Sequence, residues 1–210
     1  YYLAENLAAR ADDFAVLLDR MTGNGIAAGQ AEVQATVSRL FTYAAWADKY
    51  DGAVHNVPIR GVALAMNEPV GVVGVICPDE SPLLSMISLV APLVAMGNVA
   101  VVVPSAKHAL AATELYTVLE TSDVPKGVIN IVTGPQGPLA TTLSEHDDVE
   151  GVWYFGAAEG VAAVEKAAAA NMKRTWAGDS RDWLDTNVGE GREFLRHATE
   201  VKNIWVPYGE

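Results

Sequence analysis

The chain has one cysteine, no long apolar run and few basic residues. A lone thiol forms no internal disulfide, so Cys77 indicates a reducing compartment, and we expect the protein in the cytoplasm. No apolar stretch approaches the roughly 20 residues that cross a bilayer, so we expect no membrane association. Lysine and arginine number 14 against 26 aspartates and glutamates, a formal net charge of −12. Nucleic-acid surfaces need clustered basic side chains, so we expect no nucleic-acid partner.

The sequence also has little that would hold a metal ion or direct secretion. The four histidines show no ligand spacing: His55, His108, His146 and His197. We interpret 145–148 as a solvated acidic turn and Cys77 as a small core side chain, and we expect no metal site. The N-terminus lacks the apolar region of a signal peptide. It also lacks an initiator methionine, which suggests a piece of a longer chain or a trimmed one.

What is present indicates a globular α/β protein. Half of the residues are hydrophobic and 19% are charged. Apolar side chains recur at helical spacing through residues 1–50, with an interruption at Gly23-Asn24-Gly25. Residues 51–69 are β-like and interrupted by prolines, which predicts an extended hairpin or arm.

From residue 70 the pattern changes to alternating strands and helices. Continuous apolar runs typical of buried parallel strands occur at 70–77, 99–103, 127–133 and 149–155. Helical segments follow each of them. Four such repeats predict a doubly wound, Rossmann-like parallel sheet over 70–173, with helices on both faces. The polar, glycine-rich segment that follows is interpreted as a linker, and 174–210 ends in an edge-type strand near 203–208.

Five segments, in order and at matching separations, resemble aldehyde dehydrogenases. They are EPVGVVGVICPDESPLL (68–84), APLVAMGNVAVVVPS (91–105), VPKGVINIVTG (124–134), YFGAAEG (154–160) and ATEVKNIWV (198–206). The resemblance implies the family's cofactor-domain fold, preceded by helices and joined by a β arm and a C-terminal strand that serve oligomerisation.

The departures from the family pattern concern chemistry. Glu80 stands at the place of the asparagine that donates to the oxyanion, and Asp79 stands at the place of tryptophan. An ionised carboxylate opposes developing negative charge, and loss of one such donor alone costs about 10²–10³ in rate.

The cofactor contacts of the family are also altered. Val103 replaces a lysine, and Ala106 or its neighbours replace a carboxylate; both of the family's side chains contact the adenosine ribose. Phe155 and Ala157 replace threonine and serine beside the pyrophosphate, and Val161 replaces a glycine of the next turn. The resemblance leaves five vestigial cofactor-binding candidates: Pro104, Ser105, Gly134, Gly137 and Gly156. The 134–137 turn follows a strand and begins a helix, a position where amides can hold a pyrophosphate. We expect no cofactor to be retained, and NAD if any is.

After Lys173 and Arg174 an active family member continues to the general base and then to a catalytic domain with the nucleophilic cysteine. This chain proceeds through a polar segment to the final strand, so the catalytic domain is absent and the resemblance implies no catalytic residue. We interpret Trp176, Trp183 and Trp205 as interface anchors, since tryptophan is enriched at interfaces.

Three functions are consistent with these observations. The first is a non-catalytic pseudo-domain with a structural, oligomerising role, most like the C-terminal half of aldehyde dehydrogenase family 16. Its expected partners are an aldehyde dehydrogenase domain of the same or another chain, with a homodimer as the assembly. The second is a segment that contributes to an active NAD-dependent aldehyde dehydrogenase, and the third is a nucleotide-binding regulatory domain.

Overall fold

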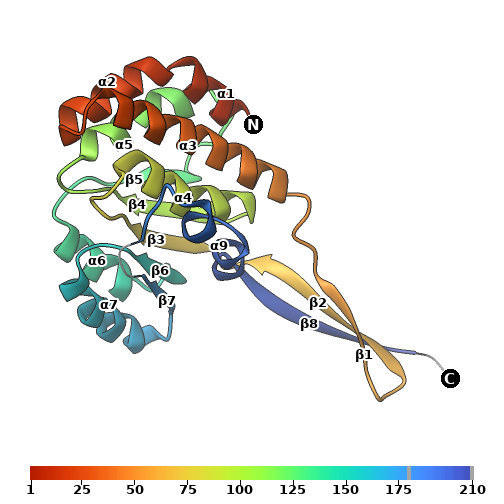
Figure 1. Cartoon of the computed structure of the whole chain (residues 1–210). Helices are drawn as coiled ribbons and strands as arrows, with labels where there is room; N and C mark the ends of the chain where they lie inside the picture. Colours follow the sequence, from red (N-terminus) through yellow and green to blue (C-terminus); the bar gives the residue numbers. More distant parts are fainter. Residues whose placement is uncertain (179–180, 209–210) are drawn as a thin grey trace.

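The computed structural model describes residues 1–178 and 181–208, and it places a parallel sheet between two helical layers with an arm to one side (Figure 1). The central strands are β3 (Val72–Ile76), β4 (Val99–Val103), β5 (Ile129–Ile131), β6 (Gly151–Tyr154) and β7 (Arg174–Ala177). Their order is β5-β4-β3-β6-β7, and every neighbouring pair is parallel. This is the strand order of a doubly wound domain, so the predicted fold class is confirmed.

Helices cover both faces of this sheet because the side chains of each strand alternate between two apolar cores. The covering helices are α4 (Pro82–Ala95), α5 (Ala109–Leu119), α6 (Gln136–Glu145), η1 (Ala158–Gly160), α7 (Val161–Ala168) and η2 (Ala169–Asn171). In β3, Val73 and Val75 belong to the larger core with α4 and α5, whereas Ile76 joins the smaller core with α6 and α7. At Gly74 a Cβ atom would lie only 3.2 Å from Leu143, so the glycine lets α6 approach the sheet closely.

Three further helices form an outer layer over α4 and α5: α1 (Tyr2–Ala9), α2 (Ala11–Thr22) and α3 (Ile26–Trp46). The helix α2 ends at Gly23, whose φ of 71° is the left-handed conformation that favours glycine. A Cβ atom at Gly29 would lie 2.5 Å from the carbonyl oxygen of Ala15, so this glycine is needed where α2 and α3 cross. No helix among the described residues is long and apolar enough to cross a membrane.

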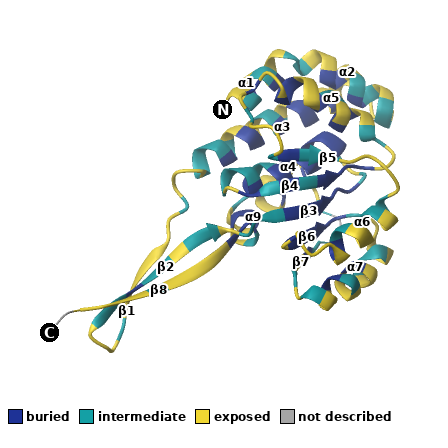
Figure 2. Cartoon of the chain, turned by 180° about the vertical axis from the view of Figure 1, so that it is seen from behind, coloured by how far each residue is buried: buried dark blue, intermediate teal, exposed yellow. Residues whose placement is uncertain are grey.

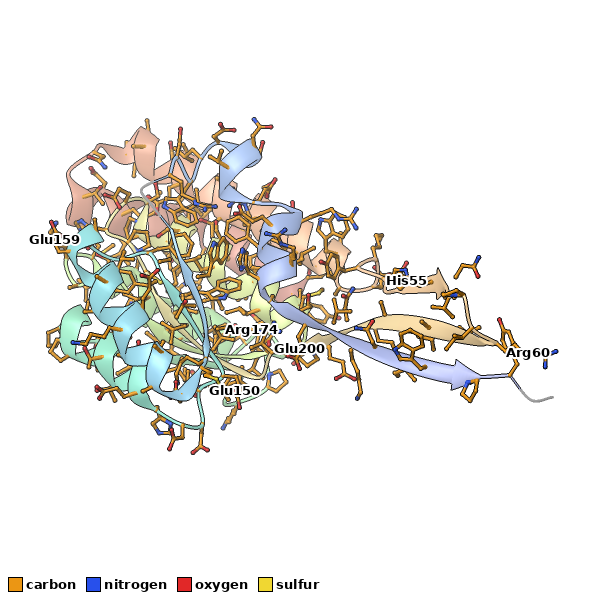
Figure 3. The ribbon with its side chains drawn as sticks, turned by 90° about the horizontal axis from the view of Figure 1, so that it is seen from below. His55, Arg60, Glu150, Glu159, Arg174 and Glu200 are labelled. Atoms are coloured by element: carbon orange, nitrogen blue, oxygen red, sulfur yellow. The ribbon has the colours of Figure 1, made fainter. Side chains whose placement is uncertain are left out.

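The arm is a three-stranded antiparallel sheet of β1 (Ala53–Asn56), β2 (Gly61–Pro69) and β8 (Thr199–Pro207), in the order β1-β2-β8. It extends away from the body, and most of its residues are exposed or only half-buried (Figure 2). Arg174 and Glu200 lie together where the arm leaves the body, while Arg60 marks its far end (Figure 3). Arg174 donates to the carbonyl of Thr199 at 3.1 Å and pairs with Glu200 at 3.1 Å, which ties the arm to β7.

The segment predicted to be a linker differs from the expectation. Its first residues form β7, which pairs with β6, so the sheet extends to Ala177 and not to residue 173. Two short helices follow, α8 (Thr186–Gly189) and α9 (Arg192–His197). Residues 179–180 and 209–210 of the predicted linker and strand lie outside the described residues.

The tryptophans of the tail divide into two groups. Trp176 and Trp183 are 9% and 2% exposed and belong to the main core, so their prediction as interface anchors is wrong. Their rings pack against those of Phe155 and Phe194. Trp205 lies on β8 and is 59% exposed, and its role as an interface anchor stays a prediction.

Candidate functional site

The candidate site lies at the carboxyl ends of β3 and β6, where the strand order reverses. In open α/β sheets the crevice at such a switch point is the usual ligand position. A cavity of about 190 Å³ occurs here, and we call it the switch-point cavity. It is lined by Pro78, Glu80, Phe155, Gly156, Ala157, Ala158, Val161, Gly178 and Trp183. The loops after β3, β6 and β7 therefore all contribute to it.

Aromatic rings fill the space beside this cavity. Phe155 is 3% exposed, and its ring centroid lies 5.0 Å from that of Trp176 and 5.6 Å from that of Trp183. A Cβ atom at Gly178 would lie 2.0 Å from the Phe155 ring, so the chain passes this ring only because residue 178 is glycine. A large apolar side chain thus occupies the position that the resemblance assigns to a small polar one.

The loop after β6 is packed against a tyrosine. The Tyr154 hydroxyl donates to the carbonyl of Ala157 at 2.9 Å, and a Cβ atom at Gly160 would lie 1.9 Å from that hydroxyl. Gly156 lies in this loop and lines the switch-point cavity, the only one of the five predicted cofactor contacts among its described lining residues. The loop's shape is therefore set by internal contacts.

A polar cluster joins the loops after β3 and β4. Ser105 donates its hydroxyl to Asp79 at 2.5 Å, and the Lys107 ammonium lies 2.7 Å from the second carboxylate oxygen of Asp79. Burial acts to raise the pKa of Asp79, but Lys107 and Ser105 outweigh it, and the pKa lies below its ordinary value. The carboxylate is ionised and already partnered, so the predicted contact Ser105 is engaged within the protein.

Gln136 is the main residue at this site that the sequence analysis missed. Its side-chain amide donates to the carbonyls of Cys77 at 2.7 Å and Pro104 at 3.1 Å. These bonds fasten the N-terminus of α6 to the ends of β3 and β4. They place Gln136, which lies in sequence between Gly134 and Gly137, against the carbonyl of Pro104. No local motif in the sequence signals this contact.

Two residues bear on catalysis. Glu80 is exposed and lines the switch-point cavity, so the carboxylate stands at the place that the resemblance assigns to an oxyanion donor. Cys77 is fully buried, and burial raises the pKa of its thiol far above the ordinary value. The thiol therefore stays protonated at neutral pH and has the character of a core side chain, not of a nucleophile.

The acidic and histidine side chains do not gather into a metal site in the part of the chain that the structure describes. His197 stacks on Trp176 at 4.0 Å between ring centroids, and burial, together with Arg196, lowers its pKa. His108 lies at the start of α5, with its Nδ1 atom buried and without a hydrogen-bond partner among the described residues.

Comparisons with known proteins place this geometry in a family. Residues 1–178 match the aldehyde dehydrogenase family. The NADP/NAD-dependent aldehyde dehydrogenase PuuC of Escherichia coli is 31% identical over 176 residues, which are 83% of this chain and 36% of that enzyme. Aldehyde dehydrogenase 1A1 of Equus caballus is 38% identical over 135 residues, 62% of this chain and 26% of that protein.

A solved structure supports the same assignment. The crystal structure of PnpE from Pseudomonas sp. WBC-3 superposes with a TM-score of 0.80 at 28% identity, over 84% of this chain and 36% of that one. The chain thus spans little more than a third of the length of these relatives. The sequence match, the strand order and the superposition agree, and the chain belongs to the aldehyde dehydrogenase family.

Proposed function

We propose that this chain is a non-catalytic aldehyde dehydrogenase module whose function is assembly. The observation that carries the proposal is the arm, which exposes an apolar face that the rest of the described chain leaves uncovered. The module would act in the cytoplasm as the C-terminal part of a larger NAD-dependent aldehyde dehydrogenase, as in family 16.

The switch point opposes both dinucleotide binding and aldehyde oxidation. A pyrophosphate would meet the Asp79 and Glu80 carboxylates, and the Lys107 ammonium is already paired with Asp79. Phe155 takes the place of a hydroxyl that would orient the cofactor, and binding sites depend on such well-placed polar groups. The residues present therefore do not fit NAD, and we expect no hydride transfer at this site.

The arm presents one apolar face. The register places six apolar residues on one side of the arm, the side that also carries Asn56, Glu68, Glu200 and Lys202. The apolar residues are Val54, Val62, Leu64, Met66, Ile204 and Val206. We call this set the arm face. Val54 is 72% exposed, and Met66 and Val206 are also exposed. The other three members are half-buried. Contiguous exposed apolar surface marks an interaction site, and an isolated small sheet is marginally stable without packing.

The partner that we propose is an aldehyde dehydrogenase domain, in the same or another chain, and for this chain alone a second copy. At the base of the arm, the Lys202 ammonium lies 2.9 Å from the Glu68 carboxylate, so the two charges compensate each other. Two copies related by a two-fold axis would bring identical arm faces together without charge repulsion there. A homodimer is thus the expected assembly.

Sedimentation of paired lysine variants tests the arm. Val54→Lys with Val206→Lys should convert a dimer to a monomer, because lysines on the arm face would have to be desolvated in the contact. The comparison variant is Ala53→Lys with Asn203→Lys, which adds the same charge to the same two strands on the opposite face, where Trp205 lies. A monomeric wild-type protein, or equal dissociation by both variants, would contradict this role.

A nucleotide-binding role has one observation in its favour, the cavity that persists at the switch point. Titration calorimetry with NAD at millimolar concentration separates the two functions, since heat of binding would favour the regulatory domain. The remaining alternative is a contribution to an active enzyme. Production of NADH from an aldehyde by this chain alone would support it and would overturn the assembly module.

A further inference from the structure

The segment 181–198 follows the part of the chain that matches the family, yet it is packed into the core. Trp183 is 2% exposed, and Phe194 and Leu195 of α9 are fully buried. Phe194 contacts the Trp176 ring at 5.2 Å between centroids, and Trp183 contacts Phe155. The segment thus packs on the side of β6 and β7 opposite α7, within the larger core, and its Trp183 lines the switch-point cavity.

A buried arginine on α3 holds this segment from the inside. Arg39 is 2% exposed and donates to the carbonyls of Trp183, at 3.1 Å, and Gly189. It also lies 2.7 Å from the Glu190 carboxylate, and on the body side it donates to Ser88 of α4. Three of its four partners belong to the segment, so removing the segment would leave a buried charge nearly unpartnered.

A second arginine holds the segment from the outside. The Arg181 guanidinium lies over four rings, at 5.2 Å from the centroid of Phe155, 5.5 Å from Trp176 and Phe194, and 5.8 Å from Trp183. It donates to the carbonyl of Val188 at 3.0 Å. A cation over aromatic faces is stabilised by the ring quadrupoles, and here one cation joins rings from the loop after β6, from β7 and from the segment.

We propose that residues 181–198 form a strap that holds the switch-point cavity closed, with Arg39 as its latch. The strap contains only helices of four and six residues, which have little stability of their own. Its order therefore comes from the latch and the ring contacts. Segments held by few contacts open locally at a lower free energy than the core. Opening would withdraw Trp183 and expose Phe155 and the cavity wall, independently of the assembly role of the arm.

Hydrogen exchange measured by mass spectrometry on the Arg39→Lys variant tests the latch. Lysine keeps the charge but cannot reach the carbonyls of Trp183 and Gly189 together with Glu190. Exchange of the strap amides should rise about tenfold or more, as expected when charge-assisted hydrogen bonds are lost. Amides of residues 155–161 should follow, while β3 and β4 keep their protection. Arg10→Lys is the matched control, because Arg10 pairs with Glu114 far from the strap.

Two results would overturn the proposal. One is an equal rise in the strap and in β3, which would mean that the strap opens only when the whole protein unfolds. The other is faster exchange in the strap with no change at 155–161, which would separate the strap from the cavity. If Arg39→Lys does not fold, Glu190→Gln removes only the charge on the strap side. The exchange rates of the same amides should rise by a smaller factor in this variant. Unchanged exchange rates there would also overturn the proposal.

Discussion

At the scale of single residues, buried side chains with distant partners decide how this fold is held. Glu32 on α3 is 8% exposed, and its carboxylate accepts hydrogen bonds from the amides of Leu83, at 2.9 Å, and Leu84, at 3.2 Å. These amides have no acceptor within α4 itself, because they lie in its first turn. An external acceptor with negative charge is favourable at this end of a helix. Burial nevertheless raises the pKa of Glu32, and the two amide bonds oppose that rise only in part.

The raised pKa of Glu32 fixes the direction of a pH effect. A raised value means that the side chain's contribution to stability is complete below its ordinary pKa of 4.5 and declines as pH rises through the folded value. Glu32→Gln keeps an acceptor oxygen without the charge. The stability of the variant relative to the wild type should therefore increase as pH rises through the folded-state pKa of Glu32. Urea unfolding at several pH values measures this difference, and a pH-independent gap would contradict it.

The sequence predicted that a residue lies at the site only where that residue stands in a local motif. Glu80 and Phe155 stand inside family motifs, so their departures were identified and the structure places both at the switch-point cavity. Gln136, Arg39 and Arg181 stand in no motif. Arg39 donates to residues that lie 49 to 150 positions away in the sequence. The hydrophobic periodicity of the sequence gives no information on contacts between such distant residues.

At the scale of elements, strong local patterns were predicted and weak ones were not. The buried strands β3, β4 and β6 are continuous apolar runs, and their positions follow from the sequence. The strand β7 has the sequence RTWA, with two polar residues in four, and its identity depends on pairing with β6. The helices α8 and α9 are too short to show helical periodicity. The burial of Trp183 follows from these missed elements.

The edge strand β5 shows how one side chain can protect an element. No further strand of the described chain pairs with its outer edge, and the hydroxyl of Tyr116 on α5 accepts from the Ile131 amide at 2.6 Å. Edge strands with free backbone groups are templates for unwanted pairing. Tyr116→Phe removes the acceptor and should cost about 1 kcal/mol of unfolding free energy.

The amide of Ile131 reports on this loss directly. It should exchange faster in Tyr116→Phe, while the amides of β4 should be unaffected because their partners are intact. Thr113→Ala serves as the control, since the Thr113 hydroxyl bonds only to its own helix, at the carbonyl of Leu110. Unchanged exchange at Ile131 would show that solvent replaces the tyrosine without cost.

At the scale of the whole molecule, the body and the arm differ in what they leave exposed. The body buries two apolar cores and fills its switch point with its own side chains, whereas the arm has an apolar face open to solvent. The sequence indicated both parts, because the family resemblance covers the sheet and the arm alike. Closure by the strap could not be predicted, since it depends on a segment outside the family match.

This contrast predicts how the molecule responds to a dinucleotide. A ligand that binds only the folded state at ten times its Kd adds about 1.4 kcal/mol of stability. For a chain of this size such a gain would raise Tm by roughly 3–6 °C. Because Phe155, Gln136 and the Asp79–Lys107 pair occupy the site, NAD at millimolar concentration should leave Tm unchanged. Differential scanning calorimetry with and without NAD measures the shift, and adenosine at equal concentration controls for weak stacking on exposed rings. An upward shift with NAD alone would mean that the filled switch point rearranges to admit the cofactor, and the module would then be a regulatory one.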